Sequence, residues 1–345
     1  MTAASTSSLP PGADRAAPEA PARPARALGE FELIERFFAR APRRAGVGLG
    51  IGDDCALLAP AAGMQLAVSS DMLVEGRHFL ASVQPQRLGH KALAVNLSDL
   101  AACGAEPLAF TLALAMPRVD AAFLAGFAEG LFALADRHGI DLVGGDTTAG
   151  PLNLCVTVFG QVPTGAALLR SGARAGDELW VSGTLGDARL ALEVFRGTVT
   201  LPGDEFEAVR RAMECPVPRV ALGVALRGVA SAAIDLSDGL VGDLGHILRR
   251  SGVGAQLESG ALPRSAVLAR QTEALQHECL LAGGDDYELL FSAPAAARDA
   301  VHAAARRAGV DVTCIGRIEA AAGMRIVDAQ GSLLAARWHG YDHFA

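Results

Sequence analysis

Ala233-Ile234-Asp235-Leu236-Ser237-Asp238 is a short apolar run that ends in small residues and aspartates. Apolar runs of this length are typical of buried strands, and the small residues after them are typical of tight turns. Most of six further stretches repeat this pattern, the last one weakly: residues 49–54, 66–71, 96–99, 142–146, 281–286 and 338–342. The pattern predicts aspartates at the points where strands leave a buried core.

Several carboxylates on one rim of a protein repel one another unless cations hold them. Mg²⁺ prefers oxygen ligands and usually binds together with substrate phosphates. The combined pattern therefore indicates metal-assisted phosphoryl transfer. Taken singly, stretches such as 50–54 and 283–286 are equally typical of ordinary turns. Ser237 or Asp238 could also cap a following helix, and the two roles are compatible because a helix N-terminus also accepts phosphate.

Length and composition narrow the class of protein. The 345 residues predict two domains, and 51% hydrophobic residues are enough for a sizeable core. A net charge of -8 argues against a nucleic-acid partner. No apolar stretch reaches the length of a membrane span, so no membrane partner is expected. Six scattered cysteines are typical of reduced core residues in a cytoplasmic protein.

The basic residues are almost all arginine. Lys91 is the one lysine among 30 basic residues, and it lies in the stretch 89–99. Lysine is a common phosphate binder, and an ammonium cannot simply replace a guanidinium at a tight site. A specific role for Lys91 and a chance position are both compatible with the sequence.

The chain divides into a tail and two domains. Residues 1–28 are rich in Ala, Pro and Ser and predict a disordered tail. A short amphipathic helix should begin near Gly29, and Pro163-Thr164-Gly165 marks the expected boundary between domains 29–163 and 164–345. Further helices are expected at 86–103, where Asn96 and Asp99 share one face, and at 120–138. Strands are expected within 45–80 and at 108–116, 152–160, 178–182, 231–236, 278–282 and 288–292.

Two common nucleotide-binding signatures are absent. The sequence has no Walker A motif and no Gly-Lys pair. The signature set of protein kinases is missing as well. A nucleotide must therefore be held by another architecture.

Five motifs together carry a family resemblance: Gly-Ile-Gly-Asp-Asp-Cys-Ala (50–56), Lys-Ala-Leu-Ala-Val-Asn-Leu-Ser-Asp-Leu-Ala (91–101), Gly-Gly-Asp-Thr-Thr (144–148), Ile-Asp-Leu-Ser-Asp-Gly-Leu (234–240) and Gly-Tyr-Asp-His-Phe (340–344). With them the chain resembles the thiamine-monophosphate kinases from residue 29 to 344. The resemblance extends to the superfamily of aminoimidazole-ribonucleotide synthetase and selenophosphate synthetase.

The resemblance implies a fold and an activity. It implies an N-terminal α+β domain with a mixed sheet through which two copies dimerise, and a C-terminal α/β domain. It implies transfer of the γ-phosphoryl group of ATP to thiamine phosphate, which gives thiamine diphosphate and ADP. The expected cofactors are several Mg²⁺ ions, and the expected partners are ATP, thiamine phosphate and a second copy of the chain.

The resemblance also implies roles for individual residues. The implied Mg²⁺ ligands are Asp54, Ser69, Ser70, Asp71, Asp99, Asp146, Asp235 and Asp238. The implied ATP contacts are Gly145, Asp146, Arg170 and Ser237, and the implied substrate contacts are His78, Asp285 and Trp338. Catalysis is expected to depend on the metal-holding carboxylates Asp71, Asp99, Asp146 and Asp238.

Two positions depart from the usual family pattern, and several have plainer interpretations. Ser70 often appears as threonine, which keeps the hydroxyl, whereas the shorter Asp285 replaces a frequent glutamate. Arg170 could be an ordinary surface charge, His78 a half-buried histidine, and Trp338 a core residue rather than a face for the thiamine ring. Two other functions stay open: another ATP-dependent enzyme of the superfamily, or a Mg²⁺- or nucleotide-binding regulator without turnover.

Overall fold

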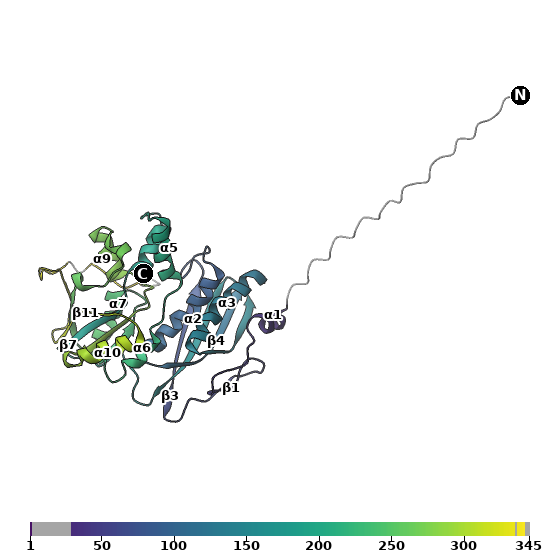
Figure 1. Cartoon of the computed structure of the whole chain (residues 1–345), viewed down its shortest axis with the longest axis horizontal. Helices are drawn as coiled ribbons and strands as arrows, with labels where there is room; N and C mark the ends of the chain where they lie inside the picture. Colours follow the sequence, from purple (N-terminus) through teal and green to yellow (C-terminus); the bar gives the residue numbers. More distant parts are fainter. Residues whose placement is uncertain (2–28, 335–336, 342–345) are drawn as a thin grey trace.

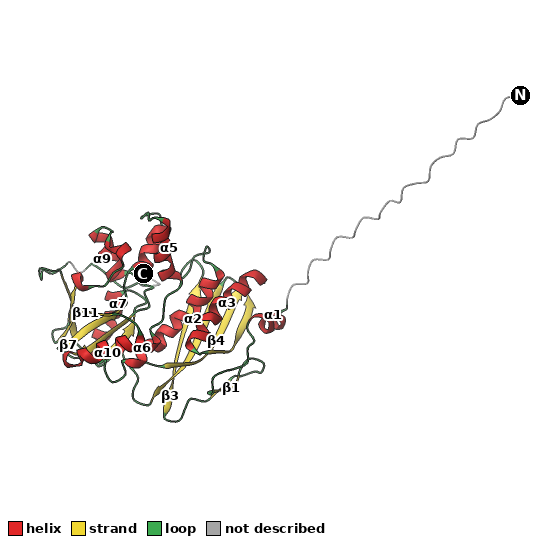
Figure 2. Ribbon diagram, viewed as in Figure 1, coloured by secondary structure: helices red, strands yellow, loops and turns green. Residues whose placement is uncertain are grey.

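The computed structural model describes residue 1 and residues 29–334 and 337–341. The predicted tail and the last motif residues from Asp342 onward lie outside the described residues. The chain forms two parts side by side, each a sheet covered by helices (Figure 1; Figure 2). Among the described helices, none is both long enough and apolar enough to cross a membrane. All six cysteines are unpaired thiols.

The first part is a mixed four-stranded sheet with helices on one face. The strand order is β3-β6-β4-β5, antiparallel except for the parallel β4–β5 pair, and a two-stranded sheet β1-β2 lies beside it. The elements are α1 (Glu30–Phe37), β1 (Val47–Leu49), β2 (Leu57–Leu58), β3 (Met64–Val74), α2 (Pro85–Ala102), β4 (Glu106–Met116), α3 (Ala121–His138), β5 (Asp141–Ala149) and β6 (Asn153–Pro163).

The second part has a six-stranded sheet in the order β12-β9-β11-β7-β10-β8, antiparallel except for β12–β9. Its elements are β7 (Asp177–Ser182), α4 (Asp187–Phe195), α5 (Gly203–Glu214), α6 (Val220–Ala225), β8 (Ala232–Asp235), α7 (Leu240–Ser251), β9 (Gly254–Glu258), η1 (Ser259–Ala261), α8 (Ala266–Ala269), α9 (Glu273–Ala282), β10 (Leu289–Pro294), η2 (Ala295–Ala297), α10 (Arg298–Ala308), β11 (Val312–Glu319) and β12 (Gly323–Val327).

Helix α2 joins the two parts. It packs on α3 and β3 of the first part and on α6 and β8 of the second part. Figure 1 shows α2 next to α3 on one side and α6 on the other. One hydrophobic core runs through this junction, from Leu97 on α2 to Leu222 on α6 and Phe291 on β10. Because the two parts share buried apolar surface, α2 is fixed relative to both sheets.

The two-part mixed fold confirms the predicted fold class, and most predicted elements exist. The helix α3 has the local signals that the sequence carries: Asp120 caps its N-terminus by accepting from the N–H groups of Ala122 and Phe123, and Gly139 ends it in the left-handed conformation.

The predicted strand at 278–282 is wrong, because these residues form the second half of α9. Thr272 caps this helix by accepting a hydrogen bond from Leu275, six residues before the supposed strand. A short apolar run cannot by itself distinguish a strand from a buried helix segment. The expectation that each aspartate follows a strand is correspondingly only partly right: Asp235 ends β8, but Asp71 and Asp146 lie inside strands, and Asp285 follows a helix.

Candidate active site

Two neighbouring elements of the first part hold carboxylates together. Ser69 and Asp71 lie on β3, and Asp99 lies on α2, which covers that strand. The Ser69 hydroxyl donates to Asp99 Oδ2 at 2.5 Å. The backbone N–H of Asp71 donates to Oδ1 of Asn96 at 3.0 Å, and Asn96 is itself buried on α2. The predicted polar face of Asn96 and Asp99 therefore serves to link α2 to β3.

The second part adds two aspartates to this group. Asp235 is buried at the end of β8, which packs against α2, and Asp238 follows in the turn before α7. Burial, and then the charges of Asp99 and Asp238, raise the pKa of Asp71 to about 7. Burial, and then the charge of Asp99, raises the pKa of Asp235 to about 8. We call Asp71, Asp99, Asp235 and Asp238 the acidic region.

A hydroxyl group and one further charge act on Asp99 in the acidic region. Burial raises the pKa of Asp99, while the Ser69 hydroxyl and the guanidinium of Arg170 act in the opposite direction. Arg170 is exposed in the segment between the two sheets, so its guanidinium faces solvent within electrostatic reach of these carboxylates. A cation in this position can bind an anionic ligand at the edge of the acidic region.

A residue that the sequence did not reveal fixes the Ser237-Asp238 turn. Oδ2 of Asp243 accepts hydrogen bonds from the backbone N–H groups of Ser237 at 3.1 Å and Asp238 at 3.0 Å. Burial, and then the charge of Asp238, raises the pKa of Asp243 to about 7. The predicted capping by Ser237 or Asp238 is wrong, because Gly239 is the N-cap residue of α7 and makes no side-chain cap. The only sequence signal for Asp243 is an acidic residue in the first turn of a predicted helix.

Three of the predicted metal ligands lie apart from the acidic region. Asp54 is exposed in the loop between β1 and β2. Ser70 points to the other face of β3 from its neighbours Ser69 and Asp71, since successive strand residues alternate, and its hydroxyl lies 2.9 Å from Oγ1 of Thr157. Asp146 is exposed within β5, where it pairs with Ala113 of β4.

Gly145, predicted to contact ATP, has a backbone that only glycine tolerates. Its φ of +146° lies in the left-handed region, and a Cβ atom would lie 1.8 Å from the carbonyl oxygen of Leu112 on β4. This glycine allows β5 to approach β4 closely just before Asp146.

The predicted substrate contacts divide into two groups. Lys91 Nζ lies 2.9 Å from Oδ2 of Asp285 and 3.2 Å from the carbonyl oxygen of His78, so it brings these two residues together. Trp338 lies in the core of the second part, 7% exposed, with its ring 5.7 Å from that of His277. The structure therefore agrees with the plainer interpretation, in which Trp338 packs in the core.

The donor chemistry of the acidic region suits Mg²⁺. Among the described residues, no three His, Cys, Asp or Glu side chains meet in a ready-made metal cluster. The acidic region instead offers carboxylate oxygens from two sides of a domain junction, whose raised pKa values reflect burial and mutual repulsion. Mg²⁺ usually keeps several waters and takes only one or two carboxylates plus phosphates, so an open arrangement fits this ion.

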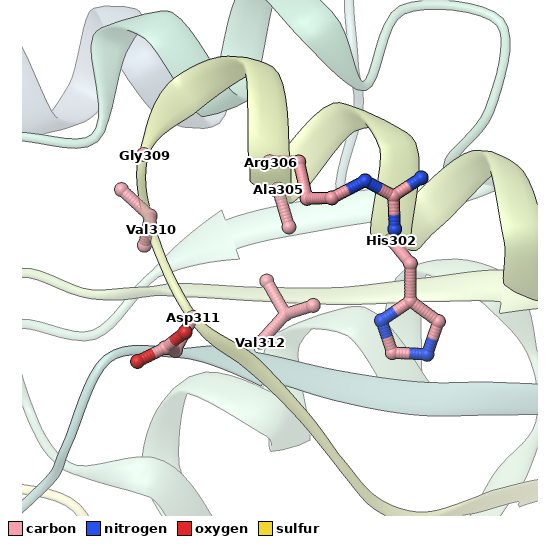
Figure 3. Close-up of a pocket in the computed structure, with 7 residues that line it drawn as sticks. All are labelled: His302, Ala305, Arg306, Gly309, Val310, Asp311 and Val312. Atoms are coloured by element: carbon pink, nitrogen blue, oxygen red, sulfur yellow. The ribbon is translucent and has the colours of Figure 1, made fainter.

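Two cavities lie elsewhere in the described part of the chain. One, of about 230 Å³, lies at the end of α10 and includes His302, Arg306 and Asp311 (Figure 3). The other, of about 490 Å³, lies between the end of β3 and the first turns of α2 and α3, with Phe79 and Phe123 in its wall. Neither is lined by a residue of the acidic region, so the electrostatics rather than cavity size mark the candidate site.

Comparisons with known proteins agree with this architecture. Residues 52–162 match the N-terminal domain of AIR synthase related protein, and residues 174–329 match its C-terminal domain. The chain is 47% identical over 324 residues to thiamine-monophosphate kinase of Salmonella typhimurium, covering 92% of this chain and 99% of the relative.

Solved structures give the same result. The crystal structure of thiamine-monophosphate kinase from Stenotrophomonas maltophilia K279a superposes with a TM-score of 0.82 at 46% identity, over 90% of this chain and 99% of that one. AaThiL, solved in complex with AMPPCP and TMP, superposes with a TM-score of 0.71 at 30% identity, over 83% of this chain and 89% of that one. The chain therefore belongs to the AIR synthase related family and, within it, to the thiamine-monophosphate kinases.

Proposed function

We propose that this chain transfers the γ-phosphoryl group of ATP to thiamine phosphate, yielding thiamine diphosphate and ADP. The observation that carries the proposal is the acidic region, built from both sides of the domain junction in a chain of the thiamine-monophosphate kinase family. The ligands of AaThiL, AMPPCP and TMP, are of the kind that this reaction requires. The reaction makes the chain an enzyme of thiamine diphosphate biosynthesis.

The acidic region would hold Mg²⁺ through Asp71, Asp99, Asp235 and Asp238. Asp54, Ser69, Ser70 and Asp146 remain proposed ligands by family resemblance, although Ser70 and Asp146 would have to act from the other face or the edge of the sheet. Bound Mg²⁺ would screen the repulsion between two phosphate groups and orient them for in-line attack. The residues of the chain prepare this region: Ser69 orients Asp99, Asn96 holds the backbone of Asp71, and Asp243 holds the Ser237-Asp238 turn.

No general base is needed in this scheme. The second ionisation of a phosphate monoester has a pKa of about 6, so the acceptor oxygen is already anionic at neutral pH. That oxygen forms the new bond to the γ-phosphorus, and the bond from the γ-phosphorus to the bridging oxygen of ADP breaks. We propose direct transfer without a phosphorylated enzyme, with Arg170, Gly145 and Ser237 helping to hold the nucleotide.

Thiamine phosphate would lie where the two parts meet. His78 and Asp285 are the proposed contacts, and Lys91 holds both of them. Trp338 is buried, but we keep it as a proposed substrate contact because residues 338–341 run past the acidic region. The N–H of Tyr341 donates to the carbonyl oxygen of Asp238.

The proposal includes a cytoplasmic homodimer. Leu66, Val68 and Met72 are 44%, 59% and 55% exposed and lie on the face of β3 that points away from α2. An exposed apolar row on a sheet is typical of an interface, and a second copy of the sheet would cover it. Unpaired thiols at all six cysteines are compatible with a reducing compartment.

The test is product formation by the purified chain. We expect ADP release and chromatographically detected thiamine diphosphate only when ATP, thiamine phosphate and Mg²⁺ are all present. Nucleotide binding without thiamine diphosphate would contradict the proposed substrate and favour another ATP-dependent enzyme of the superfamily. Product without Mg²⁺, after chelation with EDTA, would contradict the role of the acidic region.

A further inference from the structure

Lys91 is buried at the junction of the two parts although lysine is usually an exposed residue. It is the one lysine of the chain, on the middle of α2, and is 2% exposed. Its ammonium group donates to Oδ2 of Asp285 at 2.9 Å and to the carbonyl oxygen of His78 at 3.2 Å. A buried ammonium is stable only where hydrogen bonds and an opposite charge compensate its desolvation, and Asp285 and His78 provide both.

Three hydrogen bonds hold Asp285. The Tyr287 hydroxyl donates to Oδ1 at 3.1 Å, Lys91 binds Oδ2, and the backbone N–H of Asp285 donates to the carbonyl oxygen of Ser237 at 2.9 Å. Asp285 and Tyr287 have backbone φ angles of +68° and +51°, which residues other than glycine rarely adopt. Such conformations persist where the surroundings over-determine them, and they concentrate at functional sites.

The same helix connects this arrangement to the acidic region. Lys91 and Asp99 are eight residues apart on α2, about 12 Å along the helix axis at 1.5 Å per residue. Ser237 lies in the turn next to Asp238, so the Asp285 backbone bond reaches that region from the other part. Lys91 therefore fixes the position of Asp285 and of the His78 backbone relative to the carboxylates.

We propose that Lys91 is a positioning residue for thiamine phosphate, which acts by holding Asp285 and the His78 turn in the geometry that binds this substrate. This inference rests on the proposed function. Lys91 makes its contacts to Asp285 and His78, not to nucleotide-binding residues, so it governs the affinity for thiamine phosphate rather than for ATP. Loss of its ammonium leaves Asp285 as a partly buried carboxylate with one neutral donor, free to turn away from the substrate.

The alternative is a purely structural role, in which Lys91 only joins the two parts. Arg87 offers the matched control, since it lies one turn earlier on α2 and also pairs across the junction, with Nη1 3.0 Å from Oε2 of Glu214. Glu214 keeps a second partner in Arg210 when Arg87 is removed. A purely structural role predicts the same effects on stability and KM for Lys91→Met and Arg87→Met, whereas a positioning role predicts different effects.

The experiment measures steady-state thiamine diphosphate formation with each substrate varied separately. We expect Lys91→Met to raise the KM for thiamine phosphate by about tenfold or more and to change the KM for ATP by less than about twofold. Arg87→Met should lower Tm without this selective change. Tyr287→Phe, which removes the other donor to Asp285, should raise the same KM by a smaller factor and keeps the test available should Lys91→Met fold poorly.

A spectroscopic signature adds a readout that does not depend on turnover. Protein grown on [ε-15N]lysine has one labelled side chain, because Lys91 is the one lysine. We expect its ammonium signal to shift on addition of thiamine phosphate and to stay in place on addition of AMPPCP alone.

Each outcome has one meaning. Wild-type protein that forms no thiamine diphosphate contradicts the proposed function. If the wild-type protein forms thiamine diphosphate, three results would overturn the positioning role. These are equal changes in both KM values for Lys91→Met, the same effects for Arg87→Met, or a Lys91 signal that does not shift on addition of thiamine phosphate.

Discussion

The aspartates of this chain differ in what surrounds each of them. Asp71 and Asp235 lie near other carboxylates, so burial and like charge act in the same direction on their pKa values. Asp243 is buried like Asp235, but it accepts hydrogen bonds from two backbone N–H groups and fixes a turn. Asp120 is exposed and caps a helix. One residue type thus serves turn geometry, helix capping and the proposed binding of Mg²⁺, depending on the groups that face it.

Asp71→Asn should abolish turnover and leave the fold intact. The amide keeps the size of the side chain and removes a charge that burial disfavours, so stability should not fall. We expect a loss of at least about a hundredfold in kcat, because an amide holds a divalent cation less well than a carboxylate. The same result is expected for Asp238→Asn. Asp299→Asn, an exposed carboxylate on α10, is the control. Near-normal turnover of Asp71→Asn at saturating Mg²⁺ would refute the assignment.

The stability of the metal-free protein should fall as pH rises. Asp235 has a folded pKa of about 8 against an ordinary value of 3.8, so its contribution to stability is complete below about pH 4 and is lost as pH rises through about 8. Each pH unit between these two values costs about 1.4 kcal/mol, so Asp235→Asn, which cannot ionise, should lose less stability from pH 5 to pH 8, by up to about 4 kcal/mol. Thermal melts in EDTA from pH 5 to pH 8 measure this difference, and parallel curves for the two proteins would contradict it.

At the scale of elements, α2 connects the acidic region with the proposed substrate contacts. Lys91, Asn96 and Asp99 all lie on it, and their positions depend on how closely it packs against α3. Two glycines allow this approach: a Cβ on Gly89 would lie 2.0 Å from the carbonyl oxygen of Phe127, and one on Gly130 would lie 1.8 Å from that of Gln86. The site geometry is therefore set partly by residues that touch no ligand.

Gly130→Ala should separate α2 from α3. The added methyl group meets backbone rather than a flexible side chain, so we expect a loss of about 1–3 kcal/mol in the free energy of unfolding together with lower activity. Gly203→Ala is the matched control, because this glycine lies in α5 with nothing within 4 Å of an added Cβ. Equal melting temperatures for the two variants would show that the helix crossing relaxes at no cost.

At the scale of the whole molecule, the exposed row on β3 tests the proposed homodimer. Val68→Arg places a charge in the middle of this row and should convert a dimer into a monomer, measured by light scattering after size exclusion. Val217→Arg changes another exposed valine, outside β3, and should leave the assembly unchanged. A wild-type monomer, or a Val68→Arg dimer, would contradict the interface.

The sequence by itself determined the elements with strong local signals. The cap at Asp120 and the left-handed Gly139 delimit α3 because capping depends on residues within one turn. The motif residues around Asp71, Asp99, Asp235 and Asp238 indicated phosphate and metal chemistry. The strand prediction for residues 278–282 was wrong because a short apolar run is compatible with both a buried strand and a buried helix. The Thr272 cap that distinguishes the two lies outside the run.

Only the tertiary structure decided which of these side chains share one region. Strand alternation turns Ser70 away from Ser69 and Asp71, and the order of the strands in the sheet leaves Asp146 on an exposed edge strand. Lys91 and Asp285 are 194 residues apart in sequence, so nothing local could pair them. Local patterns fix helices and strands through short-range sterics and hydrogen bonds, whereas contacts between distant residues depend on how the buried faces of both parts pack around α2.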